Sequence, residues 1–234
     1  MSGIGILNAF GDTGLLLSLA AALLAWLFST RPHAALWLGV AVVMCGGATA
    51  ISKIYLHACP ITPVLRGPSG HVSFATLIYG ALVAVIAPRA PAWARWPLAV
   101  AGGTLVVAIA VGRYVIDAHT VAEILLGLGI GLVALAIFVL GYWHGGAGAR
   151  SVKPLALAAA AIAIVAYGHP FNGEVFVNAL GFGGETEHLT VAAACPAEYG
   201  QKPAPPAGGR AGRLARSGFG PAALSIAKHR RIGP

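Results

Sequence analysis

The twelve residues from Gly112 to Glu123 contain an ionisable cluster, in a chain of which only 9% of residues are charged. The cluster consists of Arg113, Asp117, His119 and Glu123. His119 and Glu123 are four positions apart, so on a helix they would lie on one face. A carboxylate placed there holds one ring nitrogen of the histidine as an N–H and directs the lone pair of the other outward, which suits a nucleophile or a base. Arg113 adds a planar guanidinium fork that suits phosphate.

A second polar segment ends in the sequence G-P-S-G-H at Gly67–His71. If a helix begins there, the backbone N–H groups of Ser69 and Gly70 would lie at its positive end and bind an anion. His71 would then be placed to donate a proton to that anion. The nearby cations are Lys53, Arg66 and Arg113. Together these residues predict a phosphate site in which one histidine attacks phosphorus and the other protonates the leaving oxygen.

The composition predicts that these residues belong to a membrane protein. Of the 234 residues, 58% are hydrophobic, which is far above the level of soluble domains. The net charge is +8, but seven of the fifteen Lys and Arg residues follow residue 200, so we expect a basic tail and no nucleic-acid binding. The three cysteines, Cys45, Cys59 and Cys195, match no metal-site or disulfide spacing.

The apolar runs predict an all-α fold, a polytopic bundle of about six transmembrane helices, because each span needs about 20 mostly apolar residues. We expect them at about 14–29, 34–51, 71–87, 97–111, 120–141 and 154–168. Prolines at 60, 63 and 68 predict an irregular loop over 52–70, and Pro97 is expected in a first turn. The membrane domain would cover residues 1–168, and the Gly- and Pro-rich residues 169–234 would form a largely disordered tail.

Six spans would place the second and fourth loops on the same side of the bilayer, so that the two polar segments can converge. The basic residues of the odd loops are Arg31, Arg89, Arg95, Arg150 and Lys153. The rule that positive loops stay in the cytoplasm therefore predicts an active site on the opposite, extracytoplasmic side. Trp93 and Trp96, beside Arg89 and Arg95, are typical of a membrane-interface belt.

These motifs resemble the type 2 phosphatidic acid phosphatase (PAP2) superfamily, which includes membrane lipid phosphatases and soluble vanadium haloperoxidases. Its three-part pattern is K-x6-R-P, P-S-G-H and S-R-x5-H-x3-D. The second part is matched at Pro68–His71, and the third is matched in spacing, with Gly112 for Ser and Glu123 for Asp. In the first part, Lys53 is followed after six residues by Pro60, where the family has Arg. The resemblance covers residues 53–123 by motif and none of the tail.

The resemblance implies a role for each matched residue. His119 would form a phosphohistidine, Glu123 would orient it, and His71 would be the general acid. The phosphate oxygens would be held by Lys53, Ser69, Gly70 and Arg113. Arg66 is our own candidate for the cation missing from the first motif, with a solvated loop charge as the alternative. No metal or other cofactor is implied, because the cations neutralise the phosphate.

The predicted function is a membrane-embedded, metal-independent hydrolase of a lipid phosphate or diphosphate, in a bacterial inner membrane. Isoprenyl diphosphate, phosphatidate and phosphatidylglycerol phosphate all remain open as substrates, and so does the oligomeric state. The alternative is a catalytically inactive relative that binds phospholipid head groups or a partner protein. A small transporter is less favoured, and the hydrophobic content excludes a soluble haloperoxidase. Glu123 with Thr120 also forms a helix capping box, and Asp117 is expected to be a cap or turn residue.

Overall fold

The computed structural model describes residues 10–58, 65, 67–144 and 151–166, and this part of the chain is all-helical. The helices are α2 (Thr13–Thr30), α3 (Pro32–Ala58), α4 (Gly70–Ile86), the short 3-10 helix η1 (Ala87–Arg89), α5 (Ala92–Val115), α6 (Val121–His144) and α7 (Lys153–Ala166). Five of them are long and apolar enough to cross a membrane, namely α2, α3, α4 extended by η1, α5 and α6. They indicate an integral membrane protein, as the composition predicts.

The helices differ from the predicted ones in three respects. The second helix, α3, continues through Lys53 to Ala58 instead of ending at residue 51, since no residue before Pro60 breaks a helix. The fourth, α5, runs from Ala92 to Val115, so Pro97 lies inside it and not in its first turn. The predicted sixth span is the 14-residue helix α7, which is apolar but shorter than the five others.

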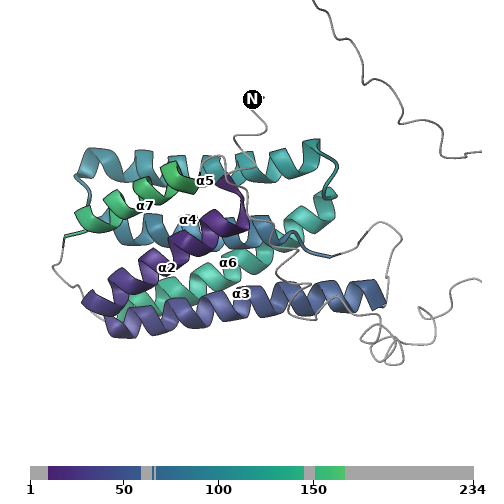
Figure 1. Ribbon diagram of the computed structural model, residues 1–234, viewed down its shortest axis with the longest axis horizontal. Coiled ribbons are helices and arrows are strands. Elements are labelled where there is room, and N and C mark those ends of the chain that lie inside the picture. The colour runs from purple at the N-terminus through teal and green to yellow at the C-terminus, as the bar shows by residue number, and fades with distance from the viewer. Residues whose placement is uncertain (1–9, 59–64, 66, 145–150, 167–234) are drawn as a thin grey trace, which may run out of the picture. The chain divides into compact units, whose positions relative to one another are not determined.

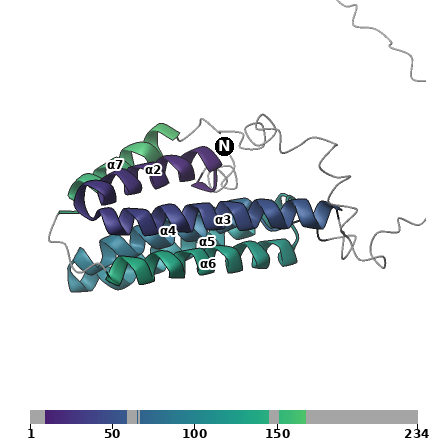
Figure 2. The ribbon, with the colours of Figure 1, turned by 90° about the horizontal axis from the view of Figure 1, so that it is seen from below.

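Helix α4 forms the centre of the bundle, and more than half of its span is buried. It packs against α2, α3, α5 and α6, whereas α7 packs on α2. Figure 2 shows α2 and α7 together on one face of the bundle and α6 on the opposite face. The outer faces carry exposed apolar side chains, among them Phe28, Leu132 and Val107, which is the pattern of helices surrounded by lipid.

The connections reverse the chain at each end of the bundle (Figure 1). A single residue, Arg31, separates α2 from α3, and Pro32 occupies the first position of α3, where its missing N–H costs nothing. Asp12 caps α2 by accepting the N–H of Gly14 at 2.8 Å. Because α3 and α5 end where α4 and α6 begin, the segments before α4 and before α6 lie at the same end of the bundle.

The end formed by Arg31, η1 and the end of α6 contains a cluster of arginines and aromatic rings. The guanidinium of Arg31 lies 4.8 Å from the ring centroid of Tyr142, and Arg89 donates to the Tyr142 hydroxyl. Trp93 and Trp96, at the start of α5, are about four-fifths exposed at this end. Their exposure fits the interface belt that the sequence predicts.

Candidate functional site

Backbone hydrogen bonds close the short turn between α5 and α6. The N–H of Asp117 donates to the carbonyl of Tyr114 at 3.0 Å, and that of Ala118 donates to the carbonyl of Arg113 at 3.1 Å. These two bonds form a Schellman motif, in which the residue after the helix takes a left-handed conformation. Asp117 has φ 53°, a value that aspartate tolerates better than most residues. The prediction that Asp117 is a turn residue is therefore confirmed.

The start of α6 carries the predicted capping box. The N–H of Thr120 donates to Oε2 of Glu123 at 3.0 Å, and the N–H of Glu123 donates to Oγ1 of Thr120 at 3.4 Å. The same Oε2 lies 3.1 Å from Nδ1 of His119. With Glu123 ionised, Nδ1 of His119 is the protonated nitrogen and Nε2 keeps its lone pair. Glu123 thus caps the helix and orients the histidine at once.

The segment before α4 docks on this turn through Glu123. The N–H of Gly67 donates to Oε1 of Glu123 at 3.3 Å, and the N–H of Ser69 donates to the Glu123 carbonyl at 3.0 Å. Glu123 itself is buried, with 4% of its surface exposed. The two polar segments are therefore joined, as their predicted position on one side of the bilayer requires. The backbone N–H of Ser69, which we expected to bind phosphate, is already used in this joint.

Helices α4 and α6 run parallel from this end and approach each other closely at two glycines. A Cβ at Gly127 would lie 2.5 Å from the carbonyl oxygen of Ser69, and one at Gly131 would lie 2.6 Å from that of Ser73. Small residues at such spacing let membrane helices pack backbone to backbone. The consequence is that two helix N-termini lie side by side, and both direct their positive dipole ends to the joint.

Both histidines lie within the electrostatic range of the same two cations. The charges of Arg113 and Lys53 act on His71 and also on His119. His71 is in the first turn of α4, and Arg113 is in the last turn of α5. The structure therefore brings together Lys53, Ser69, Gly70, His71, Arg113, His119 and Glu123. Lys53 and Arg113 were expected on loops but lie on helices, and Arg66 lies outside the described residues.

The environment of His119 favours its neutral form. Burial lowers the pKa of His119 below its usual value of 6.5, and the charges of Arg113 and Lys53 lower it further. The hydrogen bond and the negative charge of Glu123 act in the opposite direction and raise this pKa, without cancelling the decrease. An imidazole that stays neutral near pH 7 retains the lone pair on Nε2 that nucleophilic attack requires.

Three residues at the site were not predicted from the sequence. Gly67 has φ +149°, and a Cβ there would lie 2.7 Å from Cγ of Lys53, so the backbone passes directly over that side chain. Gly127 lets the backbone of α6 approach that of Ser69. Thr49, one turn before Lys53 on α3, packs against Gly70. Of the three, only Thr49 could have been recognised from the sequence, because it is a polar residue four positions before Lys53 and shares a helix face with it.

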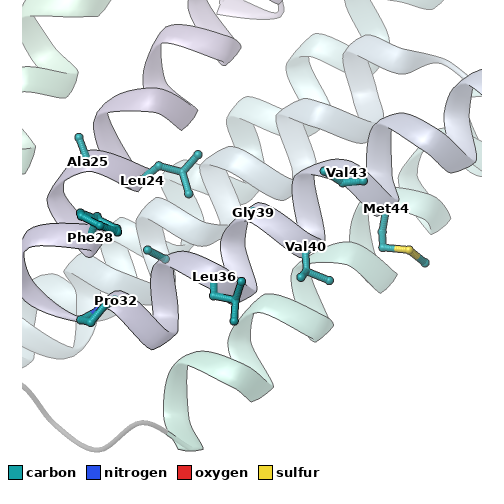
Figure 3. A pocket seen from close by; sticks show the side chains of 10 residues that line it. Leu24, Ala25, Phe28, Pro32, Leu36, Gly39, Val40, Val43 and Met44 are labelled. Atoms are coloured by element: carbon teal, nitrogen blue, oxygen red, sulfur yellow. The ribbon is translucent and has the colours of Figure 1, made fainter.

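An apolar hollow of about 790 Å³ lies on the outer surface between α2 and α3. Figure 3 shows its lining, which includes Leu24, Phe28, Leu36, Val40 and Met44. None of its lining residues is ionisable, so it has no group for acid–base or nucleophilic chemistry. The chemistry-bearing side chains are those around His119.

The chain was compared with protein-family models, with curated proteins and with solved structures, and none of them matches it.

Proposed function

We propose that the protein is a membrane-embedded, metal-independent phosphatase of the PAP2 type that hydrolyses a lipid phosphate or diphosphate. The observation that carries the proposal is the partly buried His119–Glu123 pair, which is hydrogen-bonded at 3.1 Å beside the N-terminus of α4. The positive charges of Arg113 and Lys53 act on this pair. Phosphoryl transfer uses each of these groups: a nucleophile, a carboxylate that orients it, cations and a helix N-terminus. A purely structural role would not require all of them together.

In the proposed reaction, Nε2 of His119 attacks phosphorus and forms a phosphohistidine. The bond from phosphorus to the leaving oxygen breaks, and His71 gives that oxygen its proton. Water then attacks the phosphohistidine and gives a proton to the now neutral His71, which releases inorganic phosphate and restores both histidines. Glu123 stabilises the cationic imidazole during both steps, as an orienting carboxylate does in other nucleophilic sites.

The phosphoryl oxygens would be held by Arg113, Lys53 and the free N–H groups in the first turn of α4. The first N–H groups of a helix have no partner inside it, so they remain available to an anion. Because the Ser69 N–H is bonded to the Glu123 carbonyl, we assign Ser69 a contribution through its hydroxyl alone. That hydroxyl is buried and has no hydrogen-bond partner among the described residues.

The direct test is phosphate release from phosphatidate, phosphatidylglycerol phosphate and an isoprenyl diphosphate by purified protein in detergent with EDTA. We expect turnover of at least one lipid, and its loss in His119→Ala. His144→Ala is the matched control, because His144 is an exposed histidine at the far end of α6. Full activity of His119→Ala would rule out the assigned nucleophile.

The same experiment separates the enzyme from the inactive head-group-binding protein. Under that alternative, the purified chain would bind lipid phosphates without releasing phosphate, and His119→Ala would change only binding. The Glu123 geometry favours the enzyme, since the longer side chain still reaches Nδ1 of His119 at 3.1 Å in place of the family's aspartate.

A further inference from the structure

One face of α3 packs along the first turns of α4 and the segment that leads into it. A Cβ at Gly46 would lie 3.3 Å from the ring of Phe74, and one at Gly70 would lie 3.6 Å from Cγ2 of Thr49. The contact between Gly67 and Lys53 continues this series. Thr49 and Lys53 are thus successive side chains on the α3 face that covers the N-terminus of α4.

The hydroxyl of Thr49 is in an unusual state for a helical threonine. Its residue is only 6% exposed, and its Oγ1 is buried without a hydrogen-bond partner among the described residues. Threonines inside membrane helices ordinarily donate to the carbonyl four residues earlier, as Thr76 does to Val72 at 2.7 Å. A buried hydroxyl without a partner costs stability, so its presence needs a physical explanation.

We propose that the Thr49 hydroxyl is a phosphate-binding group that donates to a non-bridging oxygen of the phosphoryl group. This inference rests on the proposed function and adds to its binding site a second residue of α3, one that lies outside the three motifs. Two residues whose buried hydroxyls have no partner in the described structure then lie at the N-terminus of α4: Ser69, its N-cap, and Thr49, beside Gly70. Thr49 would provide one neutral donor from α3, the helix that carries Lys53 of the first motif.

The test compares Thr49→Val, Thr49→Ser and Thr76→Val as full-length proteins in detergent. Inorganic phosphate and orthovanadate are the probes, and binding is measured as the rise in melting temperature with probe concentration. We expect Thr49→Val to weaken anion binding and to lower kcat/KM by about 10- to 100-fold, the range for losing one hydrogen bond to a charged group. Thr49→Ser should keep most of both.

The melting temperature without anion separates a binding role from a structural one. Thr49→Val should be as stable as the parent or more stable, because the variant no longer buries a polar group. Thr76→Val, which removes a hydroxyl that has a partner, should bind anion and turn over lipid normally.

The failures of the two proposals are distinguishable. Normal anion binding and turnover in Thr49→Val, with loss of turnover in His119→Ala, would overturn the role of Thr49 alone. A parent protein that neither binds the probes nor releases phosphate would overturn the phosphatase and the Thr49 site together. A loss of stability in Thr49→Val without anion would show the hydroxyl to be structural and would overturn the binding role.

Discussion

Gly67 donates its backbone N–H to the carboxylate of Glu123 across 3.3 Å, although 56 positions of the chain separate the two residues. This bond fixes the segment before α4 to the start of α6. Glu123 uses its other oxygen for Thr120 and His119, so one carboxylate determines where both histidine-bearing segments lie. The position of His71 relative to His119 thus depends on a residue that the motif pattern treats as a partner of His119 only.

Gly67→Ala should disrupt this joint. Its φ of +149° disfavours any side chain, and the new Cβ would lie 2.7 Å from Cγ of Lys53. We expect a loss of stability of about 1–3 kcal/mol, the usual cost of a strained backbone, together with lower activity. The measurement is thermal unfolding in detergent alongside phosphate release. Gly47→Ala, whose Cβ would meet nothing within 4 Å, is the control and should leave both unchanged.

His71→Asn should affect substrates according to their leaving group. A general acid contributes about 100- to 10,000-fold when the leaving oxygen is a poor one, as in an alkyl phosphate. A nitrophenolate leaves without protonation, so the variant should hydrolyse p-nitrophenyl phosphate far better than it hydrolyses phosphatidate, relative to the parent. The comparison of kcat/KM for the two substrates checks this. Equal losses on both would remove His71 from the role of acid.

The pH dependence of kcat/KM should reflect the charges around His119. The acidic limb of kcat/KM follows the pKa of the free nucleophile, which we expect below 6.5. Glu123→Gln removes the negative charge that raises this pKa, so the limb should move to lower pH. Lys53→Met removes a charge that lowers the pKa, so the limb should move to higher pH. Limbs that coincide in the three proteins would contradict the assignment of His119 as nucleophile.

Labelling should place the two ends of α5 on opposite sides of the membrane. Ala92 is the first residue of the span and Ala118 follows its end, and both residues are exposed. In a background with Cys59 and Cys195 replaced, Ala118→Cys should react with an impermeant maleimide in intact cells, whereas Ala92→Cys should react only after lysis. Cys45 is buried and should not interfere. The reverse pattern would place the site in the cytoplasm, and equal labelling of both would refute the span.

The parts of the site that the sequence predicts are those with local causes. The capping box of Thr120 and Glu123 and the turn at Asp117 depend on neighbours within a few positions, so the residue types alone indicate them. The apolar runs likewise predict the five long helices, because length and hydropathy decide membrane insertion.

The parts that the sequence does not predict depend on contacts between distant segments. The prolines at 60, 63 and 68 predict a loop over 52–70, but none of them lies before residue 60, and α3 continues to Ala58. Gly67 and Gly127 are two among 32 glycines, and only the packing of α4 on α3 and α6 separates them from the rest. The use of the Ser69 N–H is likewise visible only once Glu123 is in place.

The length of α3 determines how deep in the bilayer the reaction would take place. Its 27 residues extend for about 40 Å at 1.5 Å per residue, beyond the roughly 30 Å of hydrocarbon. With Pro32 at one edge of the hydrocarbon, Lys53, about 32 Å further along the helix, would lie near the lipid glycerol groups of the opposite leaflet. A lipid substrate would reach the residues around His119 by lateral diffusion within one leaflet, so turnover should scale with its mole fraction in the bilayer or micelle and not with its bulk concentration.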